Sequence, residues 1–212
     1  MMKTVCMLVL AACLAASGSG RIIYTKSFPG STPPFVSIIL DKSGRAEFRE
    51  APDEENPMKF DLGAAETKEI FELAGKLGWF SRPLEAELKV KVANMGMKTL
   101  RFEDGATKNE VKFNYTLDPD GRALADWFER ITETQMHLIA LERTARFDKL
   151  GVYNTLLQLE AAWDRKRIVA PQQFLPLLER VRRNESYVHM ARERAAGLAE
   201  AFRTASGAKA EQ

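Results

Sequence analysis

Thiols are almost absent from this sequence. Its 212 residues include two cysteines, Cys6 and Cys13, and both precede the first predicted strand. The chain after Cys13 therefore lacks a cysteine nucleophile, a CxxC redox pair, a disulfide and any thiolate ligand for a metal. The folded part must be stabilised by core packing alone.

An excess of charge of one sign is also lacking. The 31 basic and 29 acidic residues leave a net charge of +2, and they are balanced in residues 21–117 (15 and 15) and in residues 118–212 (15 and 14). This balance provides no general attraction to nucleic acid. A hydrophobic content of 45% is too high for a disordered chain. We therefore expect a folded protein without a nucleic-acid partner.

The apolar run at the start is too short to cross a membrane. It follows Met1-Met2-Lys3 and covers residues 5–12, whereas a spanning helix needs roughly 20 residues. A basic residue followed by a short apolar run is typical of a secretory signal peptide. The sequence therefore predicts export.

Two cleavage sites are open after this run. Leu10-Ala11-Ala12-Cys13 resembles the bacterial lipobox, and this resemblance implies that Cys13 is acylated and anchors the protein to a membrane. The alternative is ordinary cleavage near Ala16 or Gly18, which would leave a freely secreted chain. The small residues of 17–20 predict a flexible tether. We therefore assign residues 1–20 to a signal peptide and tether, and expect a periplasmic, membrane-anchored or secreted protein.

Residues 21–117 show mostly the period of strands. The turn sequences at 41–44 and 103–106 contain Gly44 and Gly105 and predict two hairpins. Residues 64–77 repeat apolar side chains at helical spacing, and Gly78 is placed to end this helix. An antiparallel sheet with one packed helix is therefore expected, with strands at residues 21–28, 35–40, 45–49, 87–92, 98–102 and 110–115.

At residues 116–119 the period changes from strand to helix. Asp118 is a good N-cap and Pro119 suits the first helical position. Beyond them lies one apolar seam with alternating spacings of three and four residues: Leu124, Trp127, Ile131, Thr134, Leu138, Leu141 and Ala145. This spacing predicts a long helix that packs along one face.

Three further helices are expected after Gly151. Their predicted inward residues are Leu156, Leu157 and Ala161 in 153–165, then Phe174, Leu177, Leu178 and Val181 from Pro171 on, and Tyr187, Met190, Ala191, Leu198 and Phe202 in 185–202. The predicted fold class is thus α+β, with a sheet domain at 21–117 and an all-α module of about four helices at 118–205. We expect residues 206–212 to form a disordered tail.

Several segments of the first module also carry a family resemblance. They are the loop Ser27-Phe28-Pro29-Gly30-Ser31-Thr32-Pro33-Pro34-Phe35, the hairpin at 41–44 followed by Phe48, the helix end Gly78-Trp79-Phe80, and the closing hairpin from Thr99-Leu100-Arg101-Phe102 to Val111-Lys112-Phe113. The module resembles a family of uncharacterised bacterial envelope and lipoprotein domains. The resemblance implies a fold and a compartment, and it names no catalytic residue.

Histidine is as scarce as cysteine. His137 and His189 both fall in predicted helices, each one turn from a glutamate, Glu133 and Glu193 respectively. Such spacing could supply two metal ligands from one helix face, but simple exposed ion pairs between residues four apart explain the same residues, and we favour that interpretation. Because nothing marks a third ligand, we assign no catalytic, cofactor-binding or metal-binding residue and expect no cofactor.

Two basic clusters remain, Arg165-Lys166-Arg167 and Arg180 with Arg182-Arg183. They could contact phosphate-rich surfaces, but both lie at predicted helix C-termini, where cations are favoured by the helix dipole.

The functional prediction is an exported envelope accessory protein that binds another envelope protein through its helical half. The alternative is a periplasmic hydrolase whose site is assembled from dispersed carboxylates and a histidine. A third option is an inhibitor or ligand-binding module that acts through the proline loop at 29–34.

Overall fold

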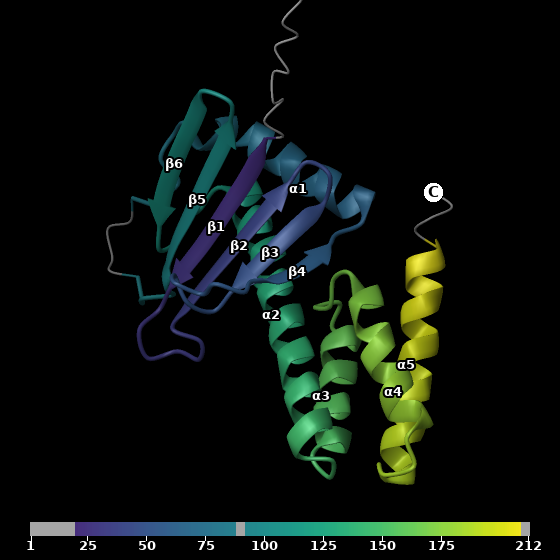
Figure 1. Cartoon of the computed structure of the whole chain (residues 1–212). Coiled ribbons are helices and arrows are strands. Elements are labelled where there is room, and N and C mark those ends of the chain that lie inside the picture. Colours follow the sequence, from purple (N-terminus) through teal and green to yellow (C-terminus); the bar gives the residue numbers. More distant parts are fainter. Residues whose placement is uncertain (1–19, 88–91, 209–212) are drawn as a thin grey trace, which may run out of the picture.

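The structure is a computed structural model that describes residues 20–87 and 92–208. It confirms the predicted α+β class, because a six-stranded antiparallel sheet is followed by helices (Figure 1). The predicted signal peptide, including Cys13, lies outside the described residues, as do residues 88–91 and 209–212. Among the described residues, no helix combines the length and apolarity needed to cross a membrane.

The sheet has the strand order β4-β3-β2-β1-β5-β6. Both predicted hairpins are present, since β2 joins β3 through Gly44 and β5 joins β6 through Gly105, and both glycines have positive φ. The central strand β1 pairs with β2 on one side and with β5 on the other. The strands are β1 (Arg21–Ser27), β2 (Phe35–Asp41), β3 (Arg45–Arg49), β4 (Met58–Asp61), β5 (Met97–Asp104) and β6 (Thr107–Phe113).

The edge strand β4 was not predicted from the sequence. It pairs with β3, is four residues long and follows Pro57 directly. Its inward side chains are Met58 and Phe60, which is too short an alternation to indicate a strand by itself. The strand predicted at 87–92 is absent at its two described ends, Glu87 and Val92, and the rest of it lies outside the described residues.

Helices cover one face of the sheet (Figure 1). The predicted helix at 64–77 is present as α1 (Ala64–Lys76), with Gly78 at φ 63° after its end. The first half of α2 (Pro119–Phe147) lies across the same face, and Phe128 stacks on Tyr24 with ring centroids 4.8 Å apart. Asp118 caps α2 as predicted, because its carboxylate accepts hydrogen bonds from the backbone N–H groups of Asp120 and Gly121 at 3.0 and 3.1 Å.

The predicted seam of α2 is buried, with Leu138 only partly so. Its residues serve two different cores: Leu124 to Ile131 pack with the sheet and α1, whereas Leu141 and Ala145 pack with the later helices. The division between the cores therefore falls inside α2, although the change of period at 116–119 marks where this helix begins.

The remaining helices are α3 (Val152–Asp164), the short η2 (Pro171–Phe174), α4 (Leu175–Arg183) and α5 (His189–Ala208). All four apolar residues predicted to point inward from Pro171 onward are buried. In α3 the prediction was wrong for Leu157 and Ala161, which are exposed, while Leu159 and Ala162 are buried instead. Neighbouring residues lie about 100° apart around a helix, so Leu156 and Leu157 cannot both be central in the buried stripe.

The last helix also differs from its prediction. It begins at His189, because residues 184–188 form a turn, and it continues to Ala208, into the stretch expected to be a tail. Met190 is 58% exposed rather than buried. Ala191, Leu198 and Phe202 are buried as predicted, and Phe202 packs edge-on against Trp163 and Phe174.

Candidate protein-binding surface

The two histidines lie on different helices and have different surroundings. His137 is partly buried in α2, and this burial lowers its pKa, an effect that Glu133 opposes and Arg165 reinforces. Glu133 is engaged elsewhere, because its carboxylate accepts a hydrogen bond from Arg167 Nε at 2.7 Å. His189 is exposed at the start of α5. Its Nε2 lies 3.1 Å from the carboxylate of Glu193, which is the contact that the four-residue spacing predicts. Within residues 20–87 and 92–208, no group of three His, Cys, Asp or Glu residues could hold a metal ion.

The predicted basic clusters have separate roles. Arg167 binds Asp126 at 2.6 Å as well as Glu133, which joins the α3–η2 connection to α2. Arg182 and Arg183 both pair with Glu179. Arg180 lines the groove described below, and Lys166 Nζ lies 5.8 Å from the centre of the Trp163 ring.

The distal end of the helical half is unusually apolar for an exposed surface. We define it as the turns at residues 148–151 and 184–188 with the helix ends beside them. Four of the eight exposed large hydrophobic residues in the described chain lie here: Phe147 (75% exposed), Leu150 (77%), Val188 (42%) and Met190 (58%). Soluble monomers rarely expose large apolar patches, and exposed hydrophobic side chains gathered at one end of a molecule are typical of an interaction site.

A groove of about 650 Å³ lies beside these residues, between the C-terminal ends of α2 and α4. Its walls include Ile139 and Phe147 from α2 and Arg180 from α4, and Tyr187 contributes from the turn before α5. The buried Tyr187 hydroxyl donates a hydrogen bond of 2.7 Å to the Ala145 carbonyl. This bond fixes the two walls relative to each other. We call this feature the distal groove.

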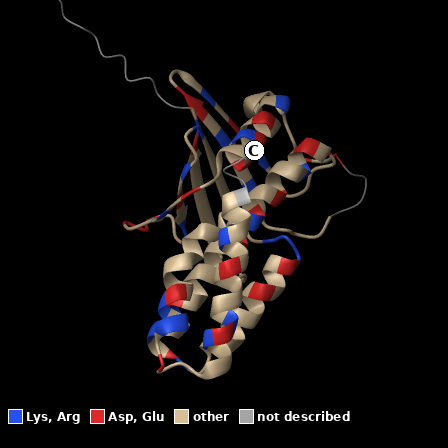
Figure 2. Ribbon diagram, turned by 90° about the vertical axis from the view of Figure 1, so that its right-hand side faces the viewer, with Lys and Arg blue, Asp and Glu red and all other residues tan. Residues whose placement is uncertain are grey.

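The lining of the distal groove is strongly basic. Arg143, Arg146, Lys149 and Arg180 line it together with a single acidic residue, Glu142, and none of these cations forms an ion pair with a carboxylate in the described part of the chain. Figure 2 shows basic residues at this lower end of the helices, with acidic residues beside them. One of these cations also contacts an aromatic ring, because the Arg146 guanidinium lies 5.1 Å from the centre of the exposed Phe147 ring. The groove thus combines apolar contacts with unneutralised positive charge.

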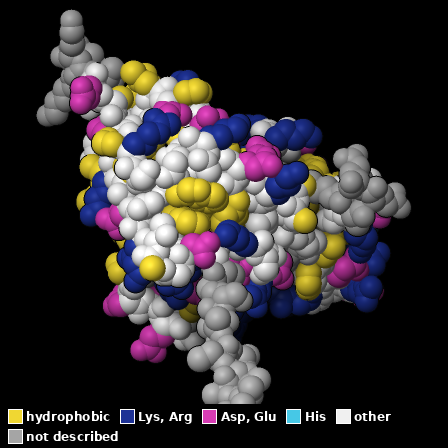
Figure 3. Space-filling model, turned by 90° about the horizontal axis from the view of Figure 1, so that it is seen from above, with side chains coloured by type: hydrophobic (Ala, Val, Ile, Leu, Met, Phe, Trp, Pro, Cys, Tyr) yellow, Lys and Arg dark blue, Asp and Glu magenta, His cyan; other side chains and the backbone are white. Residues whose placement is uncertain are grey.

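The opposite, open face of the sheet has a different character. A hollow of about 810 Å³ lies there, lined by basic and acidic residues in equal number. Along one row across the strands the charges alternate in sign, with neighbours joined by strand pairing or, for Arg45 and Asp41, by an ion pair of 3.2 Å: Asp61, Arg45, Asp41, Arg21, Glu103 and Lys108. Cross-strand pairs of opposite charge stabilise a sheet, so this row is satisfied within the protein. Figure 3 views the molecule from above, toward the end where β1 begins, and shows both charge signs mixed with apolar patches.

Sequence reasoning identified Arg180 but missed the rest of the distal groove. Phe147 and Leu150 lie off the predicted seam, on either side of a turn, and this position is the signal that could have marked them as exposed. No match to the chain is found by a scan against protein-family models or by a search of curated proteins.

Proposed function

We propose that this protein is an exported envelope accessory protein that binds another protein through its distal groove. The observation that carries the proposal is the combination of exposed Phe147 and Leu150 with the unpaired cations of the groove. Aromatic and arginine side chains are enriched at protein interfaces, where they supply most of the binding energy. A partner segment with acidic residues around an apolar side chain would fit this lining.

The orientation of the molecule favours a protein partner over a membrane. Strand β1 begins at the upper end in Figure 1, whereas the distal end lies at the bottom. If Cys13 carries a lipid, the tether to Gly20 spans at most about 25 Å at 3.3–3.6 Å per residue. Since α2 has 29 residues, it is about 43 Å long at 1.5 Å per residue. The lipid anchor would therefore hold the sheet near the membrane and direct the groove away from it.

The contact can be tested by crosslinking in cells. We expect a photo-crosslinking amino acid at position 147 to give a discrete protein adduct, whereas the same group at Lys68, which is exposed on α1 at the other end, gives none. Charge reversal by Arg143→Glu with Arg146→Glu should abolish the adduct, because the partner would then meet like charge. Lys68→Glu with Lys76→Glu is the matched control. An adduct that survives the groove variant, or none from position 147 in folded protein, would refute the assignment.

A further inference from the structure

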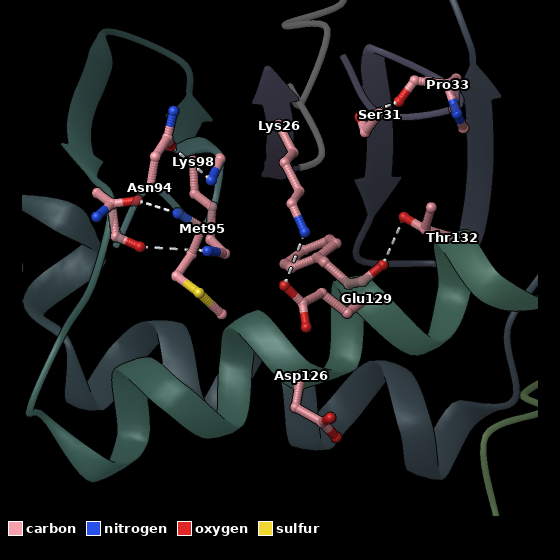
Figure 4. A network of polar contacts seen from close by, with 12 residues as sticks. Lys26, Ser31, Pro33, Asn94, Met95, Lys98, Asp126, Glu129 and Thr132 are labelled. Carbon is pink, nitrogen blue, oxygen red and sulfur yellow. Dashed lines mark hydrogen bonds and ion pairs between the residues drawn. The ribbon is translucent and has the colours of Figure 1, made fainter. Parts of the chain in front are cut away.

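Two lysines stand side by side on the helix-facing side of the sheet. Lys26 in β1 and Lys98 in β5 are direct cross-strand partners. The alternation of the strands places them on the same side as Tyr24 and Leu100, toward α2 (Figure 4). Like charges directly opposite each other destabilise a sheet. This arrangement therefore needs a compensating negative charge.

Only one of the two lysines has a carboxylate partner. Lys26 Nζ lies 3.2 Å from the carboxylate of Glu129 in α2. Lys98 is only 7% exposed, and its ammonium donates a hydrogen bond of 3.3 Å to the backbone carbonyl of Asn114. No carboxylate in the described residues comes within ion-pair distance of Lys98. Burial accordingly lowers the pKa of Lys98, against the opposing effects of Glu129 and Glu85 and with a further lowering by Lys26.

A cavity of about 180 Å³ opens beside Lys98, between α2 and the ends of β5 and β6. A cavity needs about 10–15 Å³ to hold one water molecule, so this cavity can hold a small organic group. Met95, Phe113 and Ala125 supply apolar wall, and Arg122 supplies a second cation that has no ion pair within the part of the chain described.

The acidic residues at this cavity are already neutralised. Asp126 pairs with Arg130 at 3.0 Å and with Arg167 at 2.6 Å, and Glu129 pairs with Lys26. Among the charged residues that line the cavity, those without an ion pair in the described chain are therefore two cations, the buried Lys98 and the exposed Arg122. A buried ammonium without an ion partner is costly, and an anion in the cavity would remove that cost.

We propose that this cavity binds a carboxylate group on a short apolar stem, with Lys98 as its ion-pair partner. A monoanion suits the site better than a phosphate dianion, because the Asp126 and Glu129 carboxylates also line the cavity. The apolar walls would contact the stem. Either a free short-chain acid or the C-terminus of a peptide has this chemistry. The site is independent of the distal groove.

Titration of the labelled protein by NMR tests the proposal. Butyrate should cause saturable shifts of the backbone amides of Asn114 and Ala125, and uncharged butyramide should not. Lys98→Met should weaken butyrate binding by about 10- to 100-fold, the effect expected for loss of a charge-assisted hydrogen bond. The matched control is Lys112→Met, which removes the same charge from the solvent-facing side of β6 and should bind butyrate like the wild type.

Each outcome decides the question. Shifts that are equal for butyramide, or that persist unchanged in Lys98→Met, would overturn the site. If Lys98→Met does not fold, the wild-type comparison still decides, since butyrate-specific saturable shifts support the site and their absence rejects it. Trialanine and its C-terminal amide separate the two sources: binding of the acid form alone indicates a peptide terminus, and failure of both with binding of butyrate indicates a free acid.

Discussion

The junction between the two cores depends on one buried hydroxyl. Thr134 in α2 has no exposed surface, and its Oγ1 accepts a hydrogen bond of 3.0 Å from the backbone N–H of Val169, which is itself buried. The same hydroxyl donates to the Arg130 carbonyl one turn earlier, at 2.8 Å. Thr134→Val keeps the size and the branching of the side chain but removes the acceptor for Val169.

The loss of stability in Thr134→Val follows from the two backbone groups that lose their hydrogen bond to the hydroxyl. The Val169 N–H would be buried without a partner, which costs about 1–3 kcal/mol. The Arg130 carbonyl loses little, because helical carbonyls already accept an intrahelical bond. Valine and threonine have similar helix propensities, and the additional buried methyl group returns at most about 0.8 kcal/mol. We therefore expect Thr134→Val to lower the free energy of unfolding by about 1–2 kcal/mol, and Tm by about 2–4 °C for each kcal/mol in a chain of this size.

Urea denaturation followed by tryptophan fluorescence and circular dichroism measures this loss. Thr132→Val is the matched control, since the Thr132 hydroxyl only donates to the Phe128 carbonyl of the same helix, at 2.9 Å. It should change stability by less than about 0.5 kcal/mol. Thr134→Ser keeps the acceptor and should lose less than Thr134→Val. Equal effects of the two valine substitutions would refute the role of the Thr134 hydroxyl at the junction.

Three further predictions concern the core, the sheet and the leader. Ile131→Asp should destabilise by about 4 kcal/mol or more because it buries an unpaired charge, and a loss below about 1 kcal/mol in the same denaturation assay would contradict the packing of Ile131. The hydrogen bond from Arg21 lowers the pKa of Glu103, so its stabilising effect is present above the unfolded-state pKa of about 4.3 and is lost as pH falls through the lower folded pKa; the difference in unfolding free energy between wild type and Glu103→Gln should therefore shrink in acid. Intact mass should show a lipidated mature chain that begins at Cys13, and Cys13→Ser should leave the protein unlipidated and mislocalised, whereas a soluble wild-type chain beginning at Ser17 or Ser19 would reject lipidation.

Local sequence signals predicted much of the fold. The hairpin turns contain Gly44 and Gly105 where positive φ is required, and Asp118 with Pro119 marks the start of α2. These features depend on neighbouring residues, so a single sequence carries them. Strand β4 was not predicted, because its four residues form a strand through pairing with β3 rather than through a pattern of their own.

The candidate sites were much less predictable, because each is assembled from distant segments. The distal groove joins the end of α2 to Arg180 and Tyr187, and either helix alone shows only basic residues near its C-terminus. Lys98 was assigned correctly to a strand. That it faces Lys26 is a consequence of the pairing of β1 with β5, which no local pattern encodes.

The shared helix α2 explains how the molecule can hold the distal groove in a fixed direction. Leu124 and Phe128 complete the core under the sheet, whereas Leu141 and Ala145 complete the core of the later helices, so neither half buries its apolar surface without this helix. Because the chain after Cys13 has no thiol, no disulfide can perform this joining. The bond from Val169 to Thr134 and the ion pairs of Arg167 fix α2 at the point where the cores meet. A hinge at that point would let the groove turn in any direction relative to the start of β1. The continuous helix instead joins the two cores directly, as the proposed anchored binding module would require.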